Sequence, residues 1–552
     1  MMKKSLYYWD FVLPAVVVLL SIIAAVLSLP YHIDSLCDEG FLWLWVQNAQ
    51  NGKVGDGSLW ANMLASVLGE KICSSIFSLR VVNGVLSFLT VLVFWLITKN
   101  NVAKGTASKV LFLVMLFFVL NPIAGIVVCY NGISRFFLVL ACAAMFRLFF
   151  DDKLGGLWAL LLGFAITISF FSILPSAVLI GGCAVVLLVV RFWGKWRDMG
   201  IYVVMMFLGC VLALLFVHFV VADLRDVYSG MVNTAKTITT VNRGYDPLSM
   251  IIKVLLFFRD YFLFLMASFG IICTSYLLKK NLPRLMWLGS VFYVLSFLVY
   301  WYYQKEPGWS ISMFLSLLWI QQLIGRWEDG IPKIKSLFGF DSLFNCFLCF
   351  FPLLATIGTN VPIGSKMMWF VLPWGLLLWR LGFDGKNAFF RGELLLVLSL
   401  LLSIGCYRQF KSIDISLTKV ANGPLAGMRL EPSQESHFEE VGEILQAYHY
   451  QRGKSVVFST QLSMMTICYY EAVPCGLFFQ PMDFVAHSSD DLQVPDFLFL
   501  CRFDETVAGE KLKDMPWGWP EQFDRYFVGT PEDVQVGYPT DRWLYCRKNL
   551  KE

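Results

Sequence analysis

The chain has 552 residues, of which 57% are hydrophobic, 16% aromatic and only 15% charged, whereas a soluble protein carries about 25% charged residues. Its mean hydropathy is +0.64, and its formal net charge is +4. These values exclude a cytosolic enzyme, a disordered scaffold and a small disulfide-bonded protein, and so small a charge does not indicate a nucleic-acid binder. They indicate a chain that lies mostly in lipid.

Long apolar runs recur along the first 410 residues. A helix needs about 20 apolar residues to cross a bilayer, where each backbone polar group must be satisfied within its own segment. The first run follows Lys3 and Lys4 but precedes no small-residue cleavage site, so we interpret it as a retained helix rather than a signal peptide. The sequence predicts about thirteen transmembrane helices, at 11–29, 81–98, 110–128, 133–150, 156–173, 175–191, 201–221, 254–278, 284–302, 310–325, 343–358, 367–380 and 392–406.

Basic residues between these runs fall in alternate loops. Loops rich in Lys and Arg stay on the cytoplasmic side of a membrane. The pattern therefore predicts a cytoplasmic N-terminus and, because the number of spans is odd, a C-terminal segment on the outer face.

Three polar segments are expected on the outer face. Residues 30–80 contain an Asp-Glu pair and two aromatic-rich stretches that predict amphipathic helices in the membrane interface, with Trp43, Trp45 and Trp60 among the interfacial side chains. Residues 222–253 form the second segment. The third is the C-terminal segment, residues 411–552, which the composition separates from a transmembrane domain spanning residues 1–410.

The C-terminal segment has frequent charges, Pro and Gly, and it lacks long apolar runs. Residues 436–450 predict a helix with Ser436 as its N-cap and Glu439 three positions later. The stretches 454–460, 496–502 and 542–548 predict strands. We therefore expect a soluble α/β domain.

Asp38 and Glu39 are adjacent carboxylates between the first apolar run and the first interfacial helix. A carboxylate at the membrane boundary can act as a general base that accepts a proton from a hydroxyl or an amine. Low-dielectric surroundings would raise the pKa of such a group toward a useful range. The alternative is that Asp38 caps the following helix.

The order of features in residues 1–80 resembles the GT-C superfamily of glycosyltransferases. A first span precedes Asp38-Glu39, an interfacial helix, the Asn51-Gly52 break and a second helix ending in Leu79-Arg80. More narrowly, the chain resembles bacterial relatives of protein O-mannosyltransferases and of lipid A aminoarabinose transferases, the glycosyltransferase family 39-like group. The resemblance implies a polytopic α-helical protein of the bacterial inner membrane, with a periplasmic C-terminal domain.

The resemblance also implies an activity. The enzyme would move a sugar from a polyprenyl-phosphate-linked donor to a lipid, glycan or protein acceptor outside the cytoplasm, with inversion at the sugar carbon. Asp38 would be the general base, with Glu39 beside it. The chain departs from many relatives because no acidic residue follows Arg135 and no Lys-Pro-Pro run follows the first interfacial helix.

Cationic and hydroxyl groups would stabilise the phosphate leaving group as its charge develops. The candidates are Lys305, Arg243 with Tyr245, and Arg135. An ionisable residue at membrane depth indicates a functional site by default. The alternatives are a Lys305 that reaches toward lipid headgroups, an Arg243 in an ordinary solvated loop, and an Arg135 in a buried structural pair.

The five histidines show no metal-ligand spacing, and no phosphate-binding Gly loop is present, so neither a metal nor another cofactor is expected. Of the fourteen cysteines, those in the apolar runs are expected to act as small hydrophobic residues. Cysteines on the outer face are compatible with disulfides or with free thiols.

Two other classes of function remain open. A transporter or flippase for a lipid-linked or small substrate would need charges near the membrane midplane and paired repeats, and no internal repeat is apparent. A non-catalytic assembly protein would use the C-terminal segment as a binding module, although that segment could equally be a lid or scaffold for the outer loops.

Overall fold

The computed structural model describes residues 22–31, 38–50, 63–98, 129–151, 154–229, 339–357, 366–378, 413–459, 464–476, 492–528 and 541–551, and scattered positions between them. The backbone of Asp38 is described, whereas its side chain is not. Three other predicted site residues, Arg243, Tyr245 and Lys305, lie outside the described residues.

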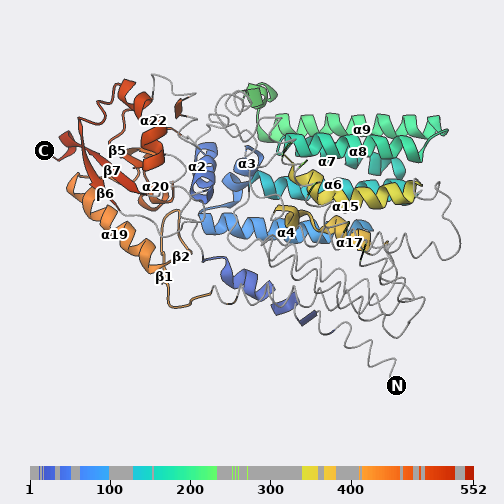
Figure 1. The fold of residues 1–552 in the computed structure, drawn as a ribbon, viewed down its shortest axis with the longest axis horizontal. Coiled ribbons are helices and arrows are strands. Elements are labelled where there is room, and N and C mark those ends of the chain that lie inside the picture. Colours follow the sequence, from blue (N-terminus) through green and yellow to red (C-terminus); the bar gives the residue numbers. More distant parts are fainter. Residues whose placement is uncertain are drawn as a thin grey trace.

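A bundle of apolar helices forms one half of the described structure (Figure 1). Among the described residues, four helices are long and apolar enough to cross a membrane: α4, α6, α8, and α9 continued by η3. The chain is thus an integral membrane protein. The helices of the bundle are α4 (Ile76–Thr98), α6 (Tyr130–Phe150), α7 (Gly155–Phe170), α8 (Leu174–Arg191), α9 (Trp196–Phe216), η3 (Val217–Val221), α15 (Phe340–Thr356), η7 (Met368–Phe370) and α17 (Leu372–Leu378).

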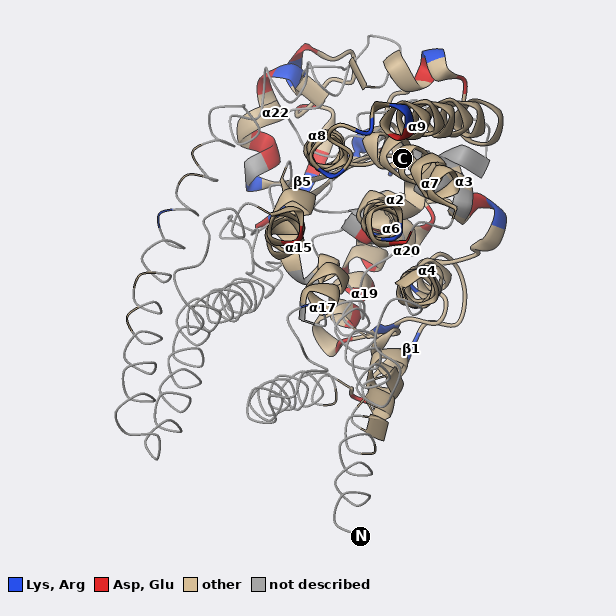
Figure 2. Cartoon of the chain, turned by 90° about the vertical axis from the view of Figure 1, so that its right-hand side faces the viewer, with Lys and Arg blue, Asp and Glu red and all other residues tan. Residues whose placement is uncertain are grey.

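Helix α6 lies at the centre of the bundle, surrounded by α4, α7, α8, α15 and α17, as the end-on view of Figure 2 shows. Its hydrophobic residues are buried almost without interruption from Leu138 to Phe149. By contrast, α9 and η3 leave large apolar side chains exposed, such as Phe207 in α9 and Phe219 in η3. A helix that is apolar all round fits a protein interior, and an exposed apolar face fits contact with lipid.

The predicted spans at 81–98, 133–150, 156–173, 175–191, 201–221 and 343–358 each coincide with a helix. The span predicted at 367–380 does not form a single helix. A 3-10 turn precedes Pro373, the second residue of α17, and α17 has only seven residues, about 10 Å of rise. Because proline has no N–H to continue a helix, the chain restarts there. Since five predicted spans lie largely or wholly outside the described residues, the total of thirteen stays a prediction.

The bundle has two chemically different ends. Arg147, Arg191 and Arg380 gather at the end where α4 and α6 finish, around an aromatic cluster that includes Phe150 and Phe340. We call it the basic end. At the opposite end, α4 and α6 begin beside α2 (Asp38–Gln50) and α3 (Met63–Ile72), which lie between the bundle and the sheet in Figure 1. We call this the α2 end.

Residues 30–80 differ from their prediction at one boundary. The sequence places Leu79-Arg80 at the end of an interfacial helix, whereas α3 ends at Ile72 and Arg80 lies in the first turns of α4. The Ser75 and Ser78 side chains exchange hydrogen bonds with each other's backbone N–H, at 3.3 and 2.9 Å. This reciprocal pairing is the pattern of a capping box and starts α4 four residues before Arg80.

The C-terminal segment contains a five-stranded mixed sheet in the order β4-β3-β5-β7-β6. The predicted strands appear as β3 (Val456–Ser459), β5 (Phe497–Cys501) and β7 (Arg542–Arg547), beside β4 (Val473–Pro474) and β6 (Phe523–Phe527). The central strand β5 is buried throughout. Its alternate residues face two cores, one under α19 (Pro432–Ala447) and α20 (Met464–Tyr470) and the other under α22 (Arg502–Asp514). A short ladder of β1 (Thr418–Lys419) and β2 (Arg429–Leu430) precedes the sheet, and the 3-10 helix η10 (Lys548–Leu550) follows it.

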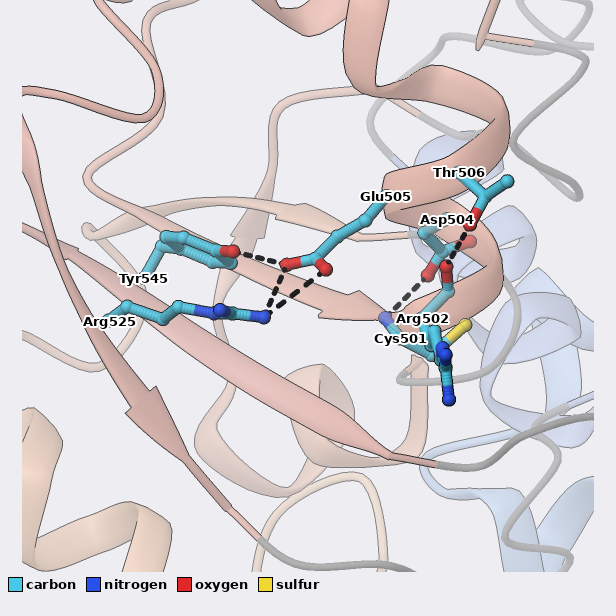
Figure 3. Close-up of polar contacts among 7 residues, drawn as sticks. All are labelled: Cys501, Arg502, Asp504, Glu505, Thr506, Arg525 and Tyr545. Carbon is cyan, nitrogen blue, oxygen red and sulfur yellow. Dashed lines mark hydrogen bonds and ion pairs between the residues drawn. The ribbon is translucent and has the colours of Figure 1, made fainter.

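Two helix starts in this segment are fixed by side-chain caps. Helix α19 begins at Pro432 with a capping box between Glu431 and Gln434, so the prediction of Ser436 as its N-cap is wrong. Proline favours the first helical position because its missing N–H would be unpaired there. At α22, the Asp504 carboxylate accepts a hydrogen bond from the Cys501 N–H at 2.9 Å, and Glu505 contacts Arg525 on β6 (Figure 3).

Candidate functional site at the start of α2

Helix α2 begins at Asp38, so the predicted base stands in the first turn of a helix. The helix dipole favours a negative charge at this position. The next residue, Glu39, is only 3% exposed and faces Arg80, which is fully buried. Glu39, the second acid of the pair predicted from the sequence, is thus held in a buried ion pair.

Arg80 makes four described hydrogen bonds from one guanidinium group. Its Nε and Nη2 donate to the two carboxylate oxygens of Glu39, at 2.8 and 2.6 Å. Its Nη1 donates to the backbone carbonyls of Leu29 and Tyr31, at 2.6 and 2.5 Å. A planar guanidinium with five N–H donors can serve all three partners at once. Arg80 thus connects the end of the first apolar helix, the start of α2 and α4.

One face of α4 is polar and continues from Arg80 into the bundle. Asn83 and Ser87 follow Arg80 at intervals of three and four, and all three are 2% exposed or less. Residues spaced this way share one face of a helix, and this face meets α6. An added Cβ at Gly132 would lie 2.6 Å from the Asn83 Oδ1, so the two helices approach closely here.

Arg135, a predicted phosphate ligand, lies at the inner end of this polar face. Its guanidinium is 2% exposed and donates from Nη2 to the Ser87 hydroxyl. Its Nε has no hydrogen-bond partner among the described residues, and no described carboxylate forms an ion pair with it. The buried charged pair that was the alternative for Arg135 is therefore not seen in the described part of the chain. Ser87 lies seven positions after Arg80, a rise of about 10 Å along α4.

Lys366 is a buried cation that sequence analysis missed. It is 2% exposed, and its Nζ lies 5.4 Å from the centroid of the Tyr130 ring and 5.8 Å from that of Trp369. Tyr130 is the first residue of α6, so this lysine lies at the α2 end. A lysine between the predicted spans at 343–358 and 367–380, directly before an apolar run with a tryptophan, was the available signal.

The C-terminal segment packs directly on α2 and α4. Trp43 and Trp45 are 4% and 2% exposed and share one core with residues of α19, α20 and β5. The prediction that these two tryptophans lie in the membrane interface is therefore wrong, although the helix that carries them is present. Because both rings lie in this core, their large apolar surface is buried against protein rather than exposed to lipid.

Hydrogen bonds also join the C-terminal segment to α2, to α4 and to the end of the first apolar helix. The Arg429 N–H donates to the Pro30 carbonyl at 2.7 Å, and the Ile76 N–H donates to the Pro424 carbonyl at 2.8 Å. The Cys468 thiol donates to the Gly40 carbonyl at 3.4 Å, two residues after Asp38. The C-terminal segment thus contacts the backbone on both sides of Asp38.

The described cysteines of residues 30–80 and of the C-terminal segment are free thiols: Cys73, Cys468, Cys475, Cys501 and Cys546. Burial raises the pKa of Cys73, although its hydrogen bond with Ser78 lowers it in part. Burial also raises the pKa of Cys475 to about 12. Such thiols stay protonated and unreactive at neutral pH. Among described residues, no group of three His, Cys, Asp or Glu side chains is arranged to hold a metal.

No family model and no curated protein matches the chain. Solved structures of the oligosaccharyltransferase of Archaeoglobus fulgidus are similar in overall arrangement. The apo form has a TM-score of 0.44 and 12% identity over 85% of this chain, and the form in complex with an inhibitory peptide and a dolichol-phosphate has 0.41 and 11% over 86%. The chain covers 64% of the length of each. Nothing about its substrates or catalytic residues follows from that likeness.

Proposed function

We propose that this chain is a membrane glycosyltransferase of the GT-C type in which Asp38 is the general base. One observation carries the proposal: a buried polar face of α4 leads from Arg80, which is bound to the neighbour of Asp38, to the buried guanidinium of Arg135. Charged groups at membrane depth are costly and mark substrate paths. Sugar transfer needs a base for the acceptor and a cation for the phosphate, and a carboxylate and a buried cation lie at the same end of this bundle.

The reaction forms a bond between the acceptor oxygen or nitrogen and the sugar C1 and breaks the bond between C1 and the phosphate oxygen. Asp38 takes the proton of the acceptor, and the electron pair of the broken bond leaves on the lipid phosphate. Arg135 would stabilise the charge that develops on the phosphate. Attack from the face opposite the phosphate gives inversion. No metal or other cofactor is required by this scheme.

The donor is proposed to be a polyprenyl-phosphate-linked sugar, hexosyl or pentosyl, and the acceptor a lipid, glycan or protein. Lys305, Arg243 and Tyr245 remain proposed donor ligands, whereas Glu39 is proposed to position Asp38 rather than to react. Both carboxylate oxygens of Glu39 accept hydrogen bonds from Arg80, which leaves this carboxylate poorly suited to remove a proton.

Orientation is proposed from the two ends of the bundle. The arginines at the basic end favour the cytoplasmic side, so the α2 end and the C-terminal segment would face outward, in the periplasm of a bacterial inner-membrane protein. The N-terminus would then be cytoplasmic, and about thirteen spans would lie in residues 1–410, with 411–552 as the soluble outer domain.

The test is Asp38→Asn in membranes supplied with a polyprenyl-phosphate sugar donor. We expect a loss of transfer of about 10²-fold or more, the usual contribution of a general base. Asp226→Asn, an exposed acid of the segment after η3, is the matched control and should keep its activity. Full activity of Asp38→Asn would exclude Asp38 as the base.

A transporter or flippase is the second candidate, because a buried polar face within a membrane helix also suits substrate passage. The two functions differ in product. Uptake into proteoliposomes without a new covalent glycoside would favour transport, whereas release of free polyprenyl phosphate together with a glycosylated acceptor would exclude it.

A further inference from the structure

We propose that Arg80 is a positioning residue that fixes the start of α2, and thereby Asp38, through Glu39. The proposal rests on the proposed function of Asp38 for its kinetic consequences and on described contacts for its geometry. Arg80 donates hydrogen bonds to Glu39 and to two backbone carbonyls, so it acts through Glu39 rather than by contact with a substrate.

The geometry leaves Arg80 little freedom. Two of its nitrogens bind the two oxygens of one carboxylate, and a third binds two carbonyls that end the first apolar helix. Bidentate pairs of this kind fix orientation as well as distance. Glu39 is consequently held at one place against α4, and its helical neighbour Asp38 is held with it.

Further contacts hold the rest of α2. The Gly40 carbonyl accepts the thiol hydrogen of Cys468, and Trp43 and Trp45 are packed in the core shared with the C-terminal segment. Val46 packs closely on Gly69 of α3, since a Cβ added at Gly69 would lie 2.8 Å from the Val46 side chain. These contacts hold α2 from Gly40 onward, and the Arg80–Glu39 pair acts on the residue directly after Asp38.

A small displacement of Asp38 would be enough to slow the reaction. Reacting groups must lie within a few tenths of an ångström of their productive geometry, and a shift of about 1 Å can cost about 10²-fold in rate. Lysine keeps the charge of Arg80 but has three donors on one nitrogen and no planar fork, so it cannot make the bidentate pair with Glu39 and also bind both carbonyls. Arg80→Lys therefore tests the hydrogen-bond geometry of Arg80 while the positive charge is kept.

The experiment compares Arg80→Lys and Arg80→Met in the full-length chain, alone and combined with Asp38→Asn. We expect Arg80→Lys to lower kcat at least tenfold with the KM of donor and acceptor changed less than twofold. In the Asp38→Asn background, Arg80→Met should change the residual rate by less than twofold, because effects that act through one group do not add. Arg147→Lys, in the ion pair at the basic end, is the matched control and should leave kcat unchanged.

Three outcomes would overturn the proposal. An unchanged kcat in Arg80→Lys would show that the planar guanidinium is not needed. A raised donor KM in Arg80→Lys would indicate that Arg80 binds the substrate directly. A rate loss of Arg80→Met that multiplies with that of Asp38→Asn would show that the two residues act independently. Failure of the proposed function is recognised separately, because Asp38→Asn alone would then be fully active. The Glu39→Gln and Arg80→Met double-mutant cycle in detergent unfolding tests the pair without any activity, and additive effects would contradict the coupling.

Discussion

Arg80 and Glu39 are brought together from positions 41 residues apart, and their pairing depends on the side of α4 that carries the arginine. An adjacent Asp-Glu pair in sequence gives no reason to separate the two acids. The structure shows that Glu39 faces a buried guanidinium, a partner that the adjacent acids do not indicate. The role of a single residue in this site is therefore inferred from the groups that it contacts.

His437 provides a pH test at the residue scale. Burial and, second, the charge of Arg542 lower its pKa to about 4 from the ordinary 6.5. Its Nδ1 lies 2.9 Å from the Val528 carbonyl, which links α19 to the end of β6. The His437 ring is thus neutral in the folded chain at neutral pH.

Between pH 6.5 and about 4 the unfolded chain binds more protons at His437 than the folded chain does. The free energy of unfolding should therefore fall as the pH falls through this window, by up to about 1.4 kcal/mol per pH unit. Unfolding of the C-terminal segment, followed by its tryptophan fluorescence at pH 7, 6 and 5, measures the slope. His437→Gln should flatten it, and an unchanged slope in that variant would contradict the assignment.

At the scale of elements, α7 and α9 pack through two glycines. A Cβ added at Gly163 would lie 2.0 Å from the Met206 carbonyl oxygen, and one added at Gly209 would lie 2.0 Å from that of Leu160. Both obstacles are backbone atoms, which cannot rotate away. Small residues let membrane helices approach in this way.

Gly163→Ala is therefore expected to destabilise the bundle by about 1–3 kcal/mol or more, the range for overpacking a tight interface. Gly182→Ala is the matched control, because nothing lies within 4 Å of its added Cβ in the middle of α8. Thermal unfolding in detergent compares the two. Equal melting temperatures would mean that α7 and α9 do not pack through these glycines.

At the scale of the whole molecule, the C-terminal segment shares one hydrophobic core with α2 and the start of α4. Trp43 and Trp45 contribute from α2 and Leu79 from α4, and Phe438, Val457 and Phe497 contribute from the C-terminal segment. Each large apolar side chain contributes about 1.5–3 kcal/mol when fully buried. The segment is therefore expected to support the start of α2 and not only to lie beside it.

Deleting residues 413–552 should expose the tryptophans of α2 and make this helix accessible to protease, with loss of monodisperse protein in detergent. Deleting only residues 548–552, which removes η10 and the last two residues, is the control and should be tolerated far better. Protease mapping of residues 38–50 and size-exclusion chromatography provide the measurements. Equal protection of α2 in both truncations would show that the segment does not support it.

Composition and apolar periodicity by themselves determined that the chain is a helical membrane protein, where six of its described helices lie, and which three stretches form strands. These are local properties, set by the need to satisfy backbone groups in lipid and by the alternation of buried residues. The restart at Pro373, the position of Arg80 inside α4 and the cap of α19 show that the boundaries were less secure.

Only the tertiary structure decided which charges meet. The pairing of Glu39 with Arg80, the place of Arg135 at the end of the polar face, the burial of Lys366 and the cover over Trp43 and Trp45 all depend on contacts between distant parts of the chain. A sequence records which side chains are costly to bury, but the partner that offsets the cost is chosen by packing.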